Sequence, residues 1–381
     1  MILLTLYGCC SAVDAILWCS CSAPPNPSNE RNALDPPSPE LSFPRPDLSP
    51  CTLERKAAAQ SDGGHQEAHD VIVEKSGRAW LFERKIMEAI FGEVWSAVEV
   101  ERSERDQPYV IRYDEEGRTR RVAVKRMSKK EIEARRGMTV EDPMHEIAAL
   151  AVLSDPGHPH VLQQVAALED DDTVYLLTPF IDGGEMFAWV IQENNRFGRR
   201  RMETVRKLFR QLAEGMKYTH SKGICHADMS LENVLLDGSR ENAYIIDFGM
   251  SLLMPFDDEH RRLKSVPDFR KAKTSYCSPE TLKGKAYDGV KVDVFAAGAM
   301  LFWMLTGRPP FTKASRLYRD FKRLVCEGKV VEAIGRHRLE LIPDGEEVAA
   351  LLRGMMAYKP EDRPTPDEVL KHPWMVHGVR G

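Results

Sequence analysis

The sequence lacks the features that stabilise a small secreted or metal-dependent domain. Its 381 residues include eight cysteines, and none of them forms a Cys-x-x-Cys pair. A disulfide framework is not expected in a chain this long, and neither is a zinc site. With a formal net charge of −5, the chain has no basic excess that would indicate nucleic-acid binding. Its 43% hydrophobic content is enough for a large core, and its length allows two or three domains.

The N-terminal segment lacks the features of a signal peptide and those of a membrane span. Residues 2–19 are mostly apolar, but Asp14 interrupts the run and no lysine or arginine precedes it. Palmitoylation of its cysteines would anchor a cytosolic tail to a membrane, so we leave the role of residues 1–22 unassigned. We expect the protein in the cytoplasm, with N-terminal membrane association or a signal sequence left open.

Large apolar residues are scarce in the next segment, residues 23–79. The stretch from Ala23 to Pro50 contains nine prolines together with many serines and asparagines. Such a composition cannot bury enough surface to offset the entropy lost on ordering the chain. We therefore expect a disordered linker that continues as a loose, polar lead-in to about residue 78.

Two polar motifs in the second half of the chain indicate a function. His226–Asn233 reads His-Ala-Asp-Met-Ser-Leu-Glu-Asn, and Asp247-Phe248-Gly249 follows after a short strand-like run. An aspartate that accepts a hydroxyl proton and an asparagine that binds magnesium can share one tight loop, and a second aspartate can reach the same metal. Either motif alone would be weak, but their order and separation are specific. Together they resemble the catalytic and metal-binding loops of the eukaryotic protein kinases.

Other segments match the same family in sequence order. Val122–Lys125 is expected to be a buried strand, and the helical Met144–Leu150 carries Glu146, the expected ion-pair partner of Lys125. Further matches are the hinge-like Thr178–Glu185, Ser278-Pro279-Glu280 at the Ala-Pro-Glu position, the helical Asp293–Gly298, and Arg363 as the partner of Glu280. The resemblance covers residues 80–376, which we expect to be the kinase domain, with residues 377–381 as a short tail.

The resemblance implies the two-lobed α+β protein kinase fold. A small lobe of five antiparallel strands and one helix would pack on a larger helical lobe, with ATP between them. Trp80–Lys125 should form the first three strands, with a long connection from about Arg102 to Arg120. The segment Val205–Leu212 has the apolar spacing of a helix with one buried face.

The resemblance also implies a role for individual residues. Asp228 would accept the substrate proton, Lys125 held by Glu146 would position the phosphates, and Asn233 and Asp247 would bind Mg²⁺. The expected nucleotide-binding residues are Gly92, Val94, Ala123, Lys125, Thr178, Phe180, Ile181, Glu185, Leu235 and Asp247. The implied cofactors are ATP and Mg²⁺, and the implied partner is a protein substrate. The sequence gives no indication of oligomeric state.

Three sites depart from the family pattern. Only Gly92 remains of the three glycines that cover the phosphates, because Met87 and Ala89 occupy the other positions, which predicts weaker nucleotide binding. Ser230 replaces the lysine that neutralises the γ-phosphate in Ser/Thr kinases. The loss of this charge-assisted hydrogen bond predicts a rate that is lower by about 10- to 100-fold. Ala227 replaces the arginine that pairs with a phosphorylated activation loop, which predicts weak dependence on that phosphate.

The substrate class is also suggested by the resemblance. Glu232-Asn233 resembles the Lys-Pro-Glu-Asn form of Ser/Thr kinases, and Glu185 and Glu232 match acidic positions of kinases that prefer arginine near the phosphosite. The alternative role of Glu185 is a contact to the ATP ribose. A second class of function stays open, in which the chain is a pseudokinase that acts as a scaffold or allosteric partner.

Overall fold

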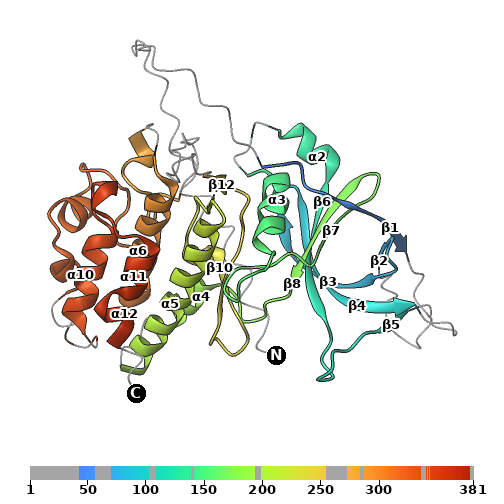
Figure 1. Cartoon of the computed structure of the whole chain (residues 1–381), viewed down its shortest axis with the longest axis horizontal. Helices are drawn as coiled ribbons and strands as arrows, with labels where there is room; N and C mark the ends of the chain where they lie inside the picture. Colours follow the sequence, from blue (N-terminus) through green and yellow to red (C-terminus); the bar gives the residue numbers. More distant parts are fainter. Residues whose placement is uncertain are drawn as a thin grey trace, which may run out of the picture.

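The computed structural model describes most of the chain from Phe43 onward. The described residues are 43–55, 70–102, 109–136, 138, 141–193, 199–254, 273–283, 287–335, 340, 342 and 344–377. The apolar N-terminus, most of the proline-rich segment and the tail 378–381 lie outside these residues, so the expectations for them stay untested. Figure 1 shows the described chain as two lobes, a strand-rich one and a helical one.

The strand-rich lobe is built on one eight-stranded sheet. Its strands are β1 (Ser49–Arg55), β2 (Asp70–Glu74), β3 (Ala79–Ala89), β4 (Gly92–Arg102), β5 (Tyr109–Ile111), β6 (Arg121–Ser128), β7 (Ala166–Glu169) and β8 (Thr173–Pro179). The five expected antiparallel strands are present as β3, β4, β6, β8 and β7, but the sheet contains three more, so the expected number was wrong. Two additional strands, β1 and β2, lie in the segment expected to be a linker, and β5 lies in the expected long connection.

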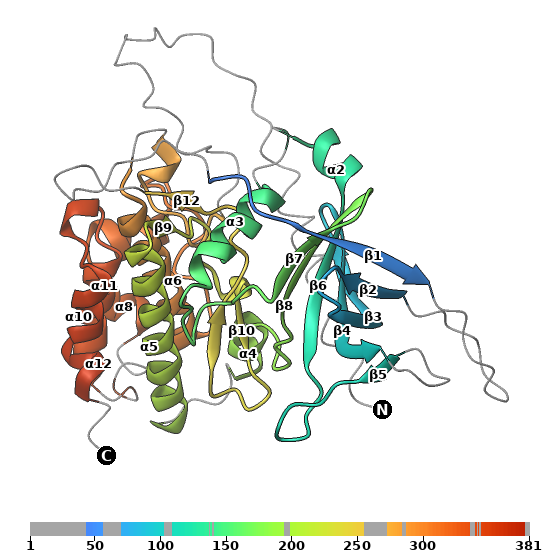
Figure 2. The same cartoon turned by 45° about the vertical axis from the view of Figure 1, so that its right-hand side comes forward.

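The additional strands close the sheet into a ring. The strand order is β3-β2-β1-β7-β8-β6-β4-β5, and β3 also pairs with β4. Strand β1 pairs with β2 in antiparallel fashion and makes a short parallel contact with β7, at Ser49–Leu168 and Pro50–Glu169. In Figures 1 and 2, β1 runs from beside helix α3 (Pro143–Leu153) to the β2 edge. The N-terminal segment therefore covers a sheet edge that would otherwise be exposed.

The ring encloses an apolar cluster because the strands alternate inward and outward side chains. Seven strands contribute to this cluster, whose members are Ile72, Trp80, Phe82, Ala97, Val122, Val124, Leu168, Tyr175 and Leu177, with Cys51, Leu53 and Trp95 partly buried against them. The alternation in β6 turns Val122 and Val124 inward. Ala123 and Lys125 consequently lie on the opposite face of the strand.

Helix α3 packs against this lobe and belongs to a second, larger core. Asp142 caps its N-terminus by accepting a hydrogen bond from the amide of Met144 at 2.8 Å, with Pro143 in the first turn. Phe43, from the N-terminal segment, is 8% exposed, and its ring centroid lies 5.6 Å from that of His145 on this helix. The segment that precedes β1 is thus tied to α3.

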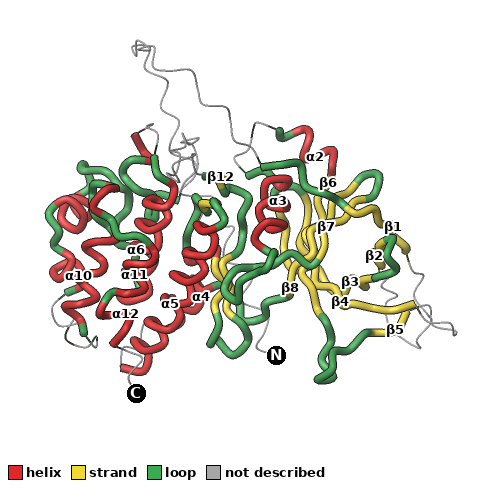
Figure 3. Tube along the Cα trace, in the orientation of Figure 1, coloured by secondary structure: helices red, strands yellow, loops and turns green. Residues whose placement is uncertain are grey.

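The second lobe is helical, as Figure 3 shows by colour. Its α-helices are α4 (Met186–Glu193), α5 (Arg199–Ser221), α6 (Gly289–Thr306), α7 (Arg319–Phe321), α8 (Val330–Ile334), α10 (Gly345–Met355), α11 (Pro366–Lys371) and α12 (Pro373–His377). The single-turn segments η1 (Leu231–Asn233), η2 (Thr281–Lys283), η3 (Lys322–Cys326) and η4 (Pro360–Asp362) connect them. The remaining elements are α2 (Lys129–Ala134) in the strand-rich lobe and the short strands β9 (Ile224–Cys225), β10 (Val234–Leu236), β11 (Ala243–Ile245) and β12 (Leu252–Leu253).

Helix α6 forms the centre of the helical lobe. Among the described residues it alone has the length and apolarity of a membrane-spanning helix, yet 89% of it is buried inside the protein. An apolar surface on all sides is the pattern of a core helix. The expected helices over 144–150 and 205–212 are confirmed as parts of α3 and α5. The two-lobed α+β architecture was predicted correctly.

Candidate active site

An ion pair links the sheet to helix α3. Nζ of Lys125 lies 2.6 Å from Oε2 of Glu146, and the two side chains are 23% and 7% exposed. Burial opposes the lysine charge, but the carboxylates of Glu146 and Asp247 outweigh it and raise the pKa of Lys125. Lys125 is therefore a cation at neutral pH. Its position on the outward face of β6 directs it away from the ring interior.

Sheet register brings the expected adenine-binding residues together. Val94 on β4 pairs with Lys125 on β6, and Ala123 pairs with Thr178 on β8. On the helical side, Glu185 and Leu235 form an isolated β-bridge. Phe180 and Ile181 follow β8 directly and are partly buried. The residues on the sheet and those on the helical side belong to opposite lobes. They can therefore form the two walls of one nucleotide-binding cleft.

The hairpin between β3 and β4 takes the place of the glycine-rich loop. A Cβ atom on Gly92 would lie 2.0 Å from the carbonyl oxygen of Arg126, so only glycine allows this close approach of the two strands. Phe91 beside it is buried in the core cluster that includes α3 residues, whereas Met87 is half-exposed. The structure thus gives Gly92 a packing role in addition to the phosphate contact that its position suggests.

The catalytic-loop segment is held by a buried aspartate of α6. Asp293 accepts hydrogen bonds from the backbone amides of His226 and Ala227 at 2.9 and 3.0 Å, and it pairs with His220 at 2.8 Å. Ala227 has a φ of +62°, a conformation that costs energy in a residue with a side chain. The anchoring by Asp293 holds the loop in this strained form and fixes the direction of Asp228.

Asp228 and Asn233 are joined within that loop. Nδ2 of Asn233 donates to the backbone oxygen and to Oδ2 of Asp228, both at 2.8 Å. The amide oxygen of Asn233 is therefore turned away from Asp228 and is the atom available to a cation. Burial raises the pKa of Asp228, an effect that the positive charge of Lys273 reduces in part.

The second metal-ligand candidate, Asp247, also has a left-handed backbone, with a φ of +63°. Several carboxylates surround it. Burial raises the pKa of Glu141, and the negative charges of Asp247, Glu146 and Asp228 raise it further. Within the described residues no group of three His, Cys, Asp or Glu forms a complete metal cage. This donor set fits magnesium, which binds through one or two protein carboxylates while phosphates and water supply the remaining ligands.

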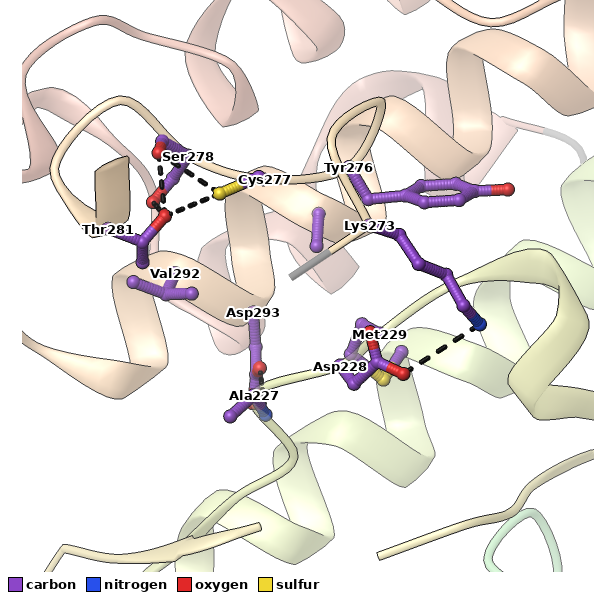
Figure 4. A pocket seen from close by; sticks show the side chains of 11 residues that line it. Ala227, Asp228, Met229, Lys273, Tyr276, Cys277, Ser278, Thr281, Val292 and Asp293 are labelled. Carbon is purple, nitrogen blue, oxygen red and sulfur yellow. Dashed lines mark hydrogen bonds and ion pairs between the residues drawn. The ribbon is translucent and has the colours of Figure 1, made fainter. Parts of the chain in front are cut away.

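A lysine that sequence reasoning did not assign to the site lies beside Asp228. Nζ of Lys273 is 3.7 Å from Oδ2 of Asp228 (Figure 4). It also donates a hydrogen bond of 2.9 Å to Oγ of Ser230. Lys273 follows the segment 255–272, which lies outside the described residues. Its only sequence signal is membership of a basic cluster that also includes Arg261, Arg262, Lys264, Arg270 and Lys271.

The Ser-Pro-Glu segment is anchored by a buried arginine. Arg363 donates from both terminal nitrogens to the Glu280 carboxylate at 2.5 and 2.8 Å, and its guanidinium lies 4.7 Å from the ring of Phe295. Arg363 is 2% exposed. The bidentate pair that the sequence pattern predicted is therefore present, and it fixes the chain that follows Lys273 against the helical lobe.

Two acidic side chains lie near the catalytic loop on the helical side. Burial raises the pKa of Glu185, and the negative charge of Glu232 adds to the effect. Oε2 of Glu232 is buried and accepts no hydrogen bond from the described residues. A cationic group placed between these two carboxylates would relieve their repulsion.

Fold and cleft together define a protein of the kinase class, and comparison with known proteins agrees. The family described as "Protein kinase domain" matches residues 109–375, so the chain belongs to the protein kinase family. Calcium-dependent protein kinase 9 of Oryza sativa subsp. japonica is 32% identical over 262 residues, covering 68% of this chain and 42% of the relative.

Two proteins of Arabidopsis thaliana are also similar. CBL-interacting serine/threonine-protein kinase 13 is 28% identical over 231 residues, covering 61% of this chain and 42% of its own. CBL-interacting serine/threonine-protein kinase 15 is 30% identical over 259 residues, covering 68% and 56% respectively. The chain thus spans only about half of the length of these relatives.

Proposed function

We propose that the chain is an active Ser/Thr protein kinase that transfers the γ-phosphoryl group of ATP to a protein hydroxyl. The observation that carries this proposal is the arrangement of five side chains. Lys125 is paired with Glu146, and Asp228 with Asn233, while Asp247 lies close enough for its carboxylate to raise the pKa of Lys125. A scaffold without phosphotransfer activity would not need to keep all five catalytic side chains in this arrangement.

In the proposed reaction Asp228 accepts the proton of the substrate hydroxyl. The hydroxyl oxygen attacks the γ-phosphorus in line, a new P–O bond forms, and the bond to the β-phosphate oxygen breaks to release ADP. Lys125 holds the α- and β-phosphates, and Glu146 holds Lys125 in place. Asn233 and Asp247 would hold Mg²⁺, which supplies positive charge to the phosphate oxygens during transfer.

We also propose a preference for substrates with arginine upstream of the phosphosite. The support is the pair Glu185 and Glu232, whose carboxylates are close enough to repel each other and partly buried. Arginine would make charge-assisted hydrogen bonds there. Glu232→Gln should reduce the rate ratio between arginine-containing and alanine-containing peptides. If this rate ratio is unchanged in both Glu232→Gln and Glu185→Gln, the preference for arginine is contradicted. A raised KM for ATP in Glu185→Gln would then assign Glu185 to the ATP ribose.

We further propose that activity does not require a phosphate on the activation segment. Ala227 provides no cation for such a phosphate, and its amide is already held by Asp293. The loop from Asp247 to Glu280 contains four possible phosphate acceptors: Ser265 lies outside the described residues, Thr274 is exposed, Ser275 is partly buried, and Tyr276 is buried. A loss of activity of about tenfold or more after phosphatase treatment would contradict this proposal.

Phosphotransfer from Mg-ATP to a generic protein substrate tests the main proposal, with phosphoamino-acid analysis of the product. We expect phosphoserine or phosphothreonine from the wild type and a large loss of transfer in Asp228→Asn. Equal transfer by the two proteins would support the alternative of a pseudokinase scaffold, in which case nucleotide-independent partner binding becomes the function to test.

A further inference from the structure

The catalytic loop has no lysine of its own near the transferring phosphate, since Ser230 occupies that position. The ammonium group of Lys273 nevertheless lies beside Ser230 and Asp228. It donates to Oγ of Ser230 at 2.9 Å and lies 3.7 Å from the carboxylate of Asp228. These contacts bridge 43 residues of sequence between Lys273 and Ser230. A cation is thus delivered to the loop from another segment of the chain.

The position of Lys273 is fixed by its own backbone. Its carbonyl oxygen accepts hydrogen bonds from the amides of Tyr276 at 3.0 Å and Cys277 at 3.1 Å, which forms a tight turn. The chain then continues into Ser278 and Glu280, which the buried Arg363 holds. Figure 4 shows the Lys273 side chain extending from this turn toward Asp228. A lysine tethered in this way has fewer alternative positions than one on a free loop.

Exposure and hydrogen-bonding capacity suit contact with a ligand. The Lys273 side chain is 37% exposed, whereas that of Asp228 is 15% exposed. An ammonium group has three donors. Ser230 accepts one of them and Asp228 attracts the group, which places the partly exposed ammonium group directly at the catalytic loop.

We propose that Lys273 neutralises the γ-phosphoryl group during transfer and so replaces the lysine absent at position 230. The inference rests on the proposed kinase activity. If Asp228 contacts the attacking hydroxyl, the phosphorus lies about 3–3.5 Å from that oxygen before reaction. A cation 3.7 Å from Asp228 is then within reach of the phosphoryl oxygens. Ser230 acts as a positioning residue that orients the ammonium group.

The competing role for Lys273 is purely structural, as an ion-pair partner that holds its segment against the catalytic loop. The two roles predict different activities for a variant in which residues 230 and 273 are exchanged. In Ser230→Lys/Lys273→Ser the lysine and the hydroxyl change places, so a cation and a hydrogen-bond partner are both present, but the lysine now comes from the catalytic loop. A catalytic cation should work from either side.

The experiment compares steady-state phosphotransfer from Mg-ATP by wild type, Lys273→Met, the exchanged double variant and Lys217→Met. Lys217 is a matched surface lysine paired with Asp367 at 2.7 Å on the helical lobe. We expect Lys273→Met to lower kcat by about 10- to 100-fold, the effect of losing one charge-assisted hydrogen bond in the transition state. Its KM for ATP and its melting temperature should stay near the wild-type values. The exchanged variant should recover at least about tenfold over Lys273→Met.

Each other outcome has a defined meaning. Full activity in Lys273→Met beside an active wild type would overturn the role of Lys273 and leave the kinase function intact. An exchanged variant that folds but is no better than Lys273→Met would assign Lys273 a structural role and also overturn the proposal. A wild type without phosphotransfer would overturn both this inference and the kinase function.

Discussion

Lys125 and Glu146 are joined by a 2.6 Å contact between their side chains, although the two residues belong to different elements of the strand-rich lobe. Their pairing requires that helix α3 lie close to β6. The N-terminal segment contributes to that arrangement, because Phe43 packs on α3 and the strand that follows closes the sheet. The Lys125–Glu146 pair is thus supported by the N-terminal segment, which is distant from both residues in sequence.

Replacing Lys125 should abolish phosphotransfer. Lys125→Met leaves Glu146 buried without its partner and removes the cation for the phosphates, so we expect activity to fall by about 100-fold or more. The exposed lysine of α2, Lys130, supplies the control, and Lys130→Met should retain wild-type activity. Initial rates with saturating Mg-ATP make the comparison, and a Lys125→Met variant as active as the control would contradict the assigned role.

Truncating Phe43 should weaken the strand-rich lobe. Phe43→Ala removes a ring that is 8% exposed, and large-to-small changes at buried aromatics cost about 3–5 kcal/mol. Since the ring contacts α3, we expect a lower free energy of unfolding in urea together with lower phosphotransfer. Val152→Ala, at a partly exposed position on the same helix, should change stability by about 0.5 kcal/mol or less. Equal stability of the two variants would show that the N-terminal segment does not support α3.

Restoring the missing glycines should strengthen ATP binding. Met87→Gly/Ala89→Gly removes side chains from the hairpin between β3 and β4, so backbone amides can approach the phosphates more closely. We expect a lower KM for ATP in the double variant. Glu88→Gly, between the two positions, controls for added flexibility alone. If KM is unchanged or higher in the double variant, the hairpin contacts nucleotide through another geometry.

Removing the anchor of the catalytic loop should lower stability in a pH-dependent way. Burial opposes the charge of Asp293, but bonds from His220 and the loop amides lower the pKa of Asp293 below its usual value of 3.8. A carboxylate with a lowered pKa stabilises the folded state above its unfolded pKa, and this contribution is lost as pH falls through the folded value. Asp293→Ala should therefore cost about 3–5 kcal/mol at pH 7. Denaturant unfolding at several pH values measures this difference in the free energy of unfolding, which should shrink only below about pH 4. A difference that already shrinks between pH 7 and pH 5 would contradict the assigned role of Asp293.

The sequence predicted those parts of the fold and site that depend on local pattern. Helices α3 and α5 follow from apolar spacing, and the bidentate Arg363–Glu280 pair follows from motif position. Strand β2 does carry a local signal, the buried β-branched residues Val71 and Ile72, which the prediction of a linker overlooked. Strand β1 could not be predicted, because it contacts β7, a strand distant in sequence, through backbone pairing that leaves no local pattern. Lys273 was missed for the same reason, since its contact with Ser230 spans 43 residues and has no local signature.

The most direct test is the phosphotransfer rate of phosphatase-treated wild type beside Asp228→Asn, measured with Mg-ATP and a protein substrate. The substitution keeps the shape of the side chain and removes the group that accepts the hydroxyl proton. General-base catalysis contributes about 10²- to 10⁴-fold, so the account predicts transfer by the wild type and a loss of about that size in the variant. Equal rates for the two proteins, or no transfer by either, would contradict it.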